Sequence, residues 1–159
     1  MKKQEKTNVM RVLDAKKAVY KSHCYLDTDA ISGMEIAEAL NQDPNRVFKT
    51  LVTQGVSKNY YVFLVPVCRE LDLKKAAKAA GEKKIEMIPQ KNLLPLTGYI
   101  HGGCSPIGMK KQFPTRIDST AENFEEILFS GGKIGYQVEI SLTELTKAIP
   151  FSLIDLVVE

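Results

Sequence analysis

One lysine stands out among the residues that could do chemistry, because it lies inside an apolar run. Lys49 is flanked by Phe48 and Thr50, and strand alternation puts its side chain on the same face as Val47 and Leu51. A lysine in that place reaches water along its aliphatic stem, pairs with a carboxylate, or lines a cleft. The sequence leaves two readings open: an ordinary edge-strand lysine, or a cation that polarises a carbonyl group or holds a phosphate.

A glycine-rich segment, Gly98–Gly108, is the second candidate for chemistry. Gly102 and Gly103 can bring backbone N–H groups close to a ligand without obstruction by side chains. Such donors suit an oxyanion, since they are already oriented when negative charge develops. The dipeptide Ser105–Pro106 stiffens the exit from this segment. The alternative is a tight turn whose glycines only meet backbone requirements.

A thiol is the third candidate, because Cys104 follows the two glycines and His101 lies three residues before it. A thiol nucleophile with a histidine base is conceivable, but a buried free cysteine is also a common packing residue, and we expect that role. The chain has no Gly-x-Ser-x-Gly elbow, no Walker loop and no Rossmann fingerprint.

The elements that must position these residues follow from periodicity and capping. Capping patterns at Ser32 with Glu35 and at Ser141 with Glu144 each predict the start of a helix. Proline after Asp43 predicts another helical turn. Further helices are predicted over 7–18 and 72–80, and strands over 22–27, 47–53, 60–67, 85–88, 115–118, 127–130, 136–140 and 152–158. This order predicts an α+β fold with a mixed, partly closed, barrel-like sheet flanked by helices.

Length and composition limit the class of protein. The chain has 159 residues, 44% hydrophobic and 26% charged, which predicts one globular domain over 1–159. The longest apolar stretch, Tyr60–Cys68, has nine residues and contains Pro66, whereas a membrane-spanning helix needs about 20. We expect a cytosolic protein. Its cysteines, at 24, 68 and 104, are expected to be reduced thiols, and neither a metal nor a cofactor is expected.

Charge is distributed unevenly along the chain although the net charge is only +3. Residues 1–21 carry seven basic and two acidic groups, and residues 68–111 carry nine and four. Residues 112–159 carry three basic and eight acidic groups. These counts allow a basic face toward an anionic partner; Lys74 and Lys78 would share one face of a helix there. The alternative is that the lysines only solvate the surface.

Several blocks of sequence together resemble one known family. They are VFKTLV (47–52), LDLKKAAKAAG (71–81), LTGYIHGGCSPIGMKK (96–111), PTRID (114–118) and FSGGKIGYQVEI (129–140). In this order and spacing they resemble the YbaK/EbsC family, free-standing relatives of the editing domain inserted in bacterial prolyl-tRNA synthetases. The resemblance implies an editing-domain fold and hydrolysis of mischarged aminoacyl-tRNA.

The resemblance also implies which residues form the site. The strand lysine of the family corresponds to Lys49, and its glycine-to-proline motif corresponds to Gly102–Pro106. The early tyrosine falls at Tyr25 and the serine before the double glycine at Ser130. The implied catalytic residues are Lys49, Gly102 and Gly103, and the implied substrate-binding residues are Tyr25, Ser105, Pro106 and Ser130. Some relatives have an acidic residue where this chain has Gln137, so no carboxylate is expected there.

The expected activity is trans-editing of Cys-tRNA(Pro), with the ester carbonyl stabilised by Lys49 and the glycine-rich loop. A deacylase for Ala-tRNA(Pro) or another small aminoacyl-tRNA is the first alternative, and a non-catalytic module that binds tRNA or a synthetase is the second. The expected partners are tRNA(Pro) and prolyl-tRNA synthetase, with no DNA and no membrane. A second hydrolytic site is needed because a methylene group gives only about 1–3 kcal/mol of discrimination.

Overall fold

The computed structural model describes residues 6–159, and its strands form two sheets. The first is antiparallel, in the order β1-β7-β6, with β1 (Lys21–Cys24), β7 (Tyr136–Ile140) and β6 (Ile127–Ser130). The second has the order β4-β2-β3-β5-β8, with β4 (Ile85–Met87), β2 (Phe48–Gly55), β3 (Tyr60–Pro66), β5 (Thr115–Asp118) and β8 (Ser152–Ile154). The pairs β3–β5 and β5–β8 are parallel, so this second sheet is mixed. The expected α+β class is confirmed.

Strand β2 links the two sheets and leaves part of one edge open. One edge pairs with β3 along its whole length. The other edge meets β6 at its start, through the bridge Val47–Leu128, and β4 at its end, from Thr53 onward. Between these contacts, residues 49–51 have no strand partner on that edge within the described chain. Within the described residues neither sheet closes on itself, so the strand pairing does not confirm the expected partly closed barrel.

Four of the five helices of the described chain begin where the sequence predicts a helix start; α4 is the one that was not predicted. They are α1 (Asn8–Ala15), α2 (Gly33–Ala39), α3 (Leu73–Ala80), α4 (Leu93–Thr97) and α5 (Leu142–Leu145), with 3-10 turns at Gln90–Asn92 and Ser119–Asn123. Ser32 and Glu35 form the predicted capping box of α2, and Asp72 caps α3. The helical turn predicted after Asp43 is a plain turn, in which Arg46 N–H donates to the Asp43 carbonyl (2.9 Å).

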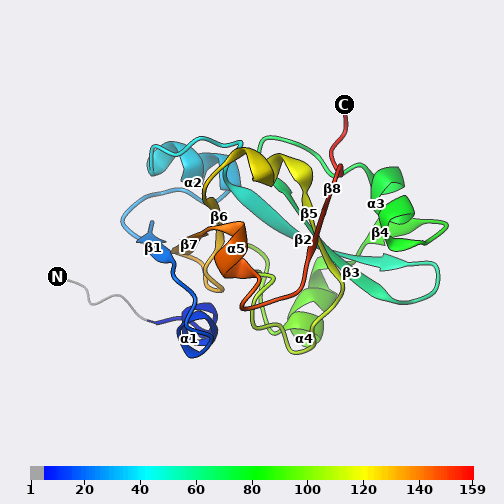
Figure 1. Ribbon diagram of the computed structural model, residues 1–159, viewed down its shortest axis with the longest axis horizontal. Coiled ribbons are helices and arrows are strands. Elements are labelled where there is room, and N and C mark those ends of the chain that lie inside the picture. Colours follow the sequence, from blue (N-terminus) through cyan, green and yellow to red (C-terminus); the bar gives the residue numbers. More distant parts are fainter. Residues whose placement is uncertain (1–5) are drawn as a thin grey trace.

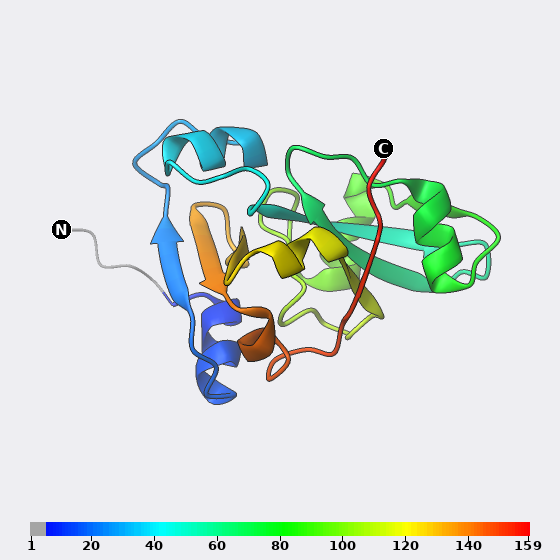
Figure 2. The ribbon, with the colours of Figure 1, turned by 45° about the horizontal axis from the view of Figure 1, so that its top comes forward.

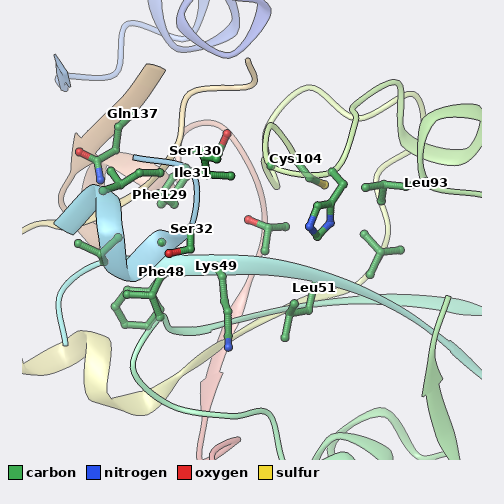
Figure 3. A pocket seen from close by; sticks show the side chains of 18 of the residues that line it. Ile31, Ser32, Phe48, Lys49, Leu51, Leu93, Cys104, Phe129, Ser130 and Gln137 are labelled. Atoms are coloured by element: carbon green, nitrogen blue, oxygen red, sulfur yellow. The ribbon is translucent and has the colours of Figure 1, made fainter. Parts of the chain in front are cut away.

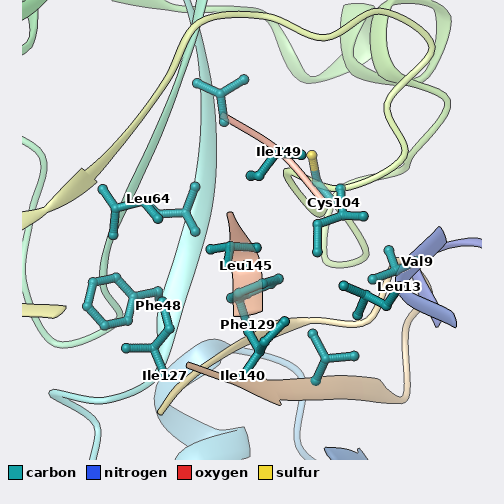
Figure 4. Packing of buried hydrophobic residues seen from close by; sticks show 14 of the residues in the cluster. Val9, Leu13, Phe48, Leu64, Cys104, Ile127, Phe129, Ile140, Leu145 and Ile149 are labelled. Atoms are coloured by element: carbon teal, nitrogen blue, oxygen red, sulfur yellow. The ribbon is translucent and has the colours of Figure 1, made fainter. Parts of the chain in front are cut away.

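Buried side chains on both faces hold β2 in place. Phe48 and Val52 pack on one face into the larger core, which fills the space between the sheets and α1 (Figure 4). Leu51 packs on the opposite face, against Phe63 and the alanines of α3. Figures 1 and 2 show the three-stranded sheet and α1 in one half of the molecule, and α3, β4 and the β2–β3 hairpin in the other. None of the helices within residues 6–159 combines the length and apolarity needed to cross a membrane.

Candidate active site

A cavity of about 470 Å³ lies along the open edge of β2. Its walls are residues 47–52 of β2, the start of α2, the end of β4, the 101–104 loop and the β6–β7 hairpin. This volume falls in the usual range for sites that take small molecules. The gap between β6 and β4 therefore produces a site at which β2 backbone and side chains are both accessible.

The chemistry of the lining is simple, because Lys49 carries the only fixed charge among the described side chains that form it. No carboxylate of residues 6–159 lines the cavity. Within residues 6–159, Lys49 Nζ makes no hydrogen bond and no ion pair. As predicted, its side chain lies on the Val47 and Leu51 face of the strand, and Figure 3 shows its amine directed away from Cys104 and Ser130. An unpaired cation beside mostly apolar surface is suited to an anionic or strongly polarised group.

The two glycines of the loop are favoured for different reasons. Gly102 has φ +87°, a left-handed backbone that glycine adopts without cost, and it lines the cavity. A Cβ at Gly103 would lie 3.2 Å from the backbone nitrogen of Ile134, so the close approach of the two loops favours glycine. The Gly103 N–H already donates to the Ile100 carbonyl (3.0 Å). The Gly102 N–H has no partner among residues 6–159, and neither has the N–H of Cys104, so the loop has unpaired backbone donors at the cavity.

The remaining predicted site residues fall into two groups. Tyr25 and Ser130 line the cavity, and Ser130 Oγ accepts a hydrogen bond from the Gly132 N–H (3.1 Å). Ser105 and Pro106 are buried and do not line it; Ser105 Oγ accepts from the Ile107 N–H (3.3 Å) and shapes the turn after the glycines. Lys49, Gly102, Tyr25 and Ser130 thus line the same cavity, although the Lys49 amine is directed away from Ser130 (Figure 3), while Gly103, Ser105 and Pro106 support the loop.

Cys104 lines the cavity, but its thiol is not activated. Burial raises the pKa of Cys104 to about 12. The thiol is therefore protonated at neutral pH and is a poor nucleophile. His101 also lines the cavity, yet no hydrogen bond joins His101 to Cys104 in the described chain. These observations favour the packing role that the sequence suggested for Cys104.

Thr50 is a site residue that the sequence reasoning missed. It lines the cavity, and its Oγ1 is buried without a hydrogen-bond partner in the described chain. A buried hydroxyl without a partner costs free energy. By contrast, Thr53 Oγ1 on the same strand donates to the Tyr61 carbonyl (2.9 Å). The sequence offers no signal that separates these two threonines, because partner atoms belong to other strands.

Gln137 on β7 is the residue at which no carboxylate is expected from the sequence. It lines the cavity and exchanges two hydrogen bonds with Gln42, at 2.7 and 3.0 Å. The amide pair is neutral and joins β7 to the segment after α2. No group of three or more His, Cys, Asp or Glu side chains in residues 6–159 is arranged to hold a metal ion.

This fold and cavity belong to a known class. Residues 28–148 match the model of the aminoacyl-tRNA editing domain. The chain therefore belongs to the aminoacyl-tRNA editing domain family, and it is an aminoacyl-tRNA deacylase of the YbaK/EbsC group.

Individual relatives agree with this assignment. The chain is 48% identical over 141 residues to an Enterococcus faecalis protein provisionally named Cys-tRNA(Pro)/Cys-tRNA(Cys) deacylase EbsC, covering 88% of this chain and 86% of that one. A solved structure described provisionally as a trans-editing enzyme for prolyl tRNA synthetase superposes with a TM-score of 0.84, at 24% identity and 96% coverage of each chain. A second solved structure, of a hypothetical protein, also has a TM-score of 0.84, at 19% identity, with 96% of this chain and all of that chain covered. At these identities the two solved structures support the fold alone.

Proposed function

We propose that this protein hydrolyses the ester bond of Cys-tRNA(Pro) in trans. The observation that carries the proposal is the unpaired cation Lys49 in a cavity to which the described chain contributes no carboxylate. The 48% identical relative, named for deacylation of Cys-tRNA(Pro) and Cys-tRNA(Cys), supports the choice of aminoacyl group. Prolyl-tRNA synthetase is the proposed partner, because it makes the mischarged tRNA.

The proposed chemistry needs little beyond positioning and charge stabilisation, because an aminoacyl ester is already activated. Attack on the carbonyl carbon places negative charge on the carbonyl oxygen. The free Gly102 N–H can donate to that oxygen, and Lys49 supplies the positive charge in the same cavity. Tyr25 and Ser130 would position the aminoacyl group and the terminal ribose.

The nucleophile is proposed to come from outside the protein. The Cys104 thiol is buried and protonated, and no carboxylate of the described chain lines the cavity. A cysteinyl ester carries its own thiol, whose sulfur can attack the carbonyl carbon to form a four-membered thiolactone while the ribose oxygen leaves and takes up the thiol proton. Water then opens the thiolactone and releases cysteine. Water is the alternative nucleophile, and the two routes differ in which aminoacyl groups they can release.

Deacylation assays on tRNA(Pro) charged with cysteine, alanine or serine test the proposal. We expect rapid release of cysteine and slow release of alanine and serine, because alanine has no thiol and the serine hydroxyl is a weaker nucleophile. Equal rates for cysteine and alanine would replace the substrate-thiol route by attack of water. No release of any aminoacyl group by folded protein, with and without prolyl-tRNA synthetase, would refute the proposed function.

A further inference from the structure

A second cavity, of about 330 Å³, adjoins the first at the end of β4. Met87 and Ile88 line both cavities, so the two cavities are neighbours along the end of β4. The second cavity is formed by the β2–β3 turn on one side and the β4 strand with Pro89 on the other. A chain-like ligand whose end occupies the first cavity would therefore pass into the second.

The lining of this second cavity combines cations with exposed apolar surface. Lys58 and Lys84 contribute positive charge, and Glu86 contributes the one carboxylate, so the formal charge of its described lining is +1. Val56 and Met87 are 59% and 45% exposed. Grooves that bind single-stranded nucleic acid track its backbone with positive charge and stack its bases on aromatic side chains. The described lining of this cavity supplies the positive charge and apolar surface but no aromatic ring.

The two lysines differ in their availability. Lys84 Nζ is paired with Glu86 (3.0 Å), whereas Lys58 Nζ has no hydrogen bond or ion pair within residues 6–159. The turn that carries Lys58 is held by Gln54, whose Nε2 donates to the Lys58 carbonyl (3.2 Å). The nearby carboxylate of Glu82 accepts hydrogen bonds from Ser57 and Tyr61 and does not line the cavity. Lys58 is thus the free cation at this position.

The distribution of charge over the molecule agrees with this location. Residues 68–111, which include α3 and β4, carry nine basic and four acidic groups, while residues 112–159, which include β6, β7 and α5, carry three and eight. Figure 1 shows α3 and β4 in the half of the molecule opposite β6 and β7. Lys75 is not part of a free basic face, because its Nζ bonds to Asp155 and to the Val157 carbonyl. The β4 end of the first cavity therefore lies beside one of the two basic segments of the chain; the other, residues 1–21, includes α1 in the opposite half (Figure 1).

We propose that the second cavity binds the nucleotide next to the terminal adenosine at the single-stranded 3′ end of tRNA, with Lys58 and secondarily Lys84 holding its phosphate. This inference rests on the proposed function, which places the terminal aminoacyl-adenosine in the first cavity. Such a contact gives affinity without reading sequence. The carboxylate of Glu86 partly neutralises the two lysines and so weakens phosphate binding. Removal of the Glu86 charge should therefore strengthen phosphate binding.

The test compares two cysteinyl esters that differ only beyond the terminal nucleoside. Lys58→Ala should raise KM for Cys-tRNA(Pro) about 3- to 10-fold and reduce the salt slope of binding by about 0.7, the loss of one phosphate contact on a single strand. It should leave hydrolysis of cysteinyl-adenosine unchanged, because that ester has no second nucleotide. Glu86→Gln should lower KM for Cys-tRNA(Pro) and also leave cysteinyl-adenosine unchanged. The matched control is Lys16→Ala. Lys16 lies just after α1 in the other half of the molecule, and its exposed side-chain amine has no partner within residues 6–159.

Direct binding separates this inference from the proposed function. Wild-type protein should bind the uncharged trinucleotide CCA more tightly than AMP, and Lys58→Ala should abolish that difference. If the wild type binds CCA in a Lys58-dependent way but releases no aminoacyl group, the nucleotide site stands and the deacylase proposal fails. The nucleotide site is overturned if Lys58→Ala loses equal activity on Cys-tRNA(Pro) and on cysteinyl-adenosine. It is also overturned if Lys58→Ala changes neither the salt slope of binding nor the affinity for CCA.

Discussion

Replacing Lys49 by methionine should separate catalysis from folding more cleanly than any other single change in this protein. Methionine keeps an unbranched stem of similar size and removes only the charge. Lys49 Nζ makes no hydrogen bond or ion pair with the rest of residues 6–159, so no protein interaction is broken. We therefore expect a change in unfolding free energy within about 0.5 kcal/mol. For a chain of this length that is a shift in Tm of about 1–2 °C.

The loss of activity should be far larger. If Lys49 stabilises charge that develops on the carbonyl oxygen, its removal is comparable to loss of an oxyanion-hole donor, which costs about 2.7–4 kcal/mol, or about 100- to 1,000-fold in kcat. The assay is steady-state deacylation of Cys-tRNA(Pro), with Tm measured by circular dichroism. Lys49→Arg should restore part of the activity, because it retains the charge.

A matched control and a clear refutation exist. Lys147→Met changes a lysine after α5 that pairs with Glu144 (2.9 Å) outside the cavity, and it should leave kcat unchanged. Folded Lys49→Met with activity within about threefold of wild type would show that the cavity acts without this cation, since threefold corresponds to less than 1 kcal/mol. The lysine would then be an ordinary edge-strand residue.

Three further predictions concern groups whose environment the tertiary structure defines. Thr50→Val should raise Tm by about 2–4 °C, because it removes a buried hydroxyl without a partner and so stabilises the fold by about 1 kcal/mol. Thr53→Val should lower Tm, because it breaks a hydrogen bond. Thermal unfolding of both variants tests this, and a lower Tm for Thr50→Val contradicts the reasoning. Cys104→Ala should retain most activity. In the native protein Cys104 should react slowly with iodoacetamide up to pH 9, because burial raises the pKa of its thiol to about 12. An acyl-enzyme trapped on this thiol would contradict the packing role. Burial opposes ionisation of Glu139, but its hydrogen bond with His23 and the charge of the neighbouring arginine outweigh burial and hold the pKa of Glu139 below its ordinary 4.5. The stabilisation from the ionised Glu139 carboxylate is complete above pH 4.5 and is lost as the pH falls through the lowered pKa. The Tm difference between wild type and Glu139→Gln should therefore be largest near pH 7 and shrink in acid. A Tm difference that does not change with pH would contradict this role of Glu139.

Local patterns in the sequence determined most of the elements of this protein. Helix starts and ends depend on contacts between residues a few positions apart, so the sequence alone predicts them. Examples are the capping box at Ser32, the cap at Asp72 and the end of α3 at Gly81. Strand alternation also predicted the face on which Lys49 lies. The same patterns could not reveal α4, because Pro95 and Gly98 in a glycine-rich stretch are typical of a loop, and this helix is only five residues long.

The site itself was decided by tertiary structure. The cavity exists because β6 and β4, which are far apart in the sequence, each pair with one end of the same edge of β2 and leave residues 49–51 between them uncovered. The preference for glycine at 103 depends on the distant backbone of Ile134, and the missing partner of Thr50 depends on what the neighbouring strands place around it. The raised pKa of Cys104 likewise reflects burial by the assembled core. Residue types and local spacing thus determine the helices, strands and candidate groups, whereas accessibility, hydrogen-bond partners and pKa depend on segments that only folding brings into contact.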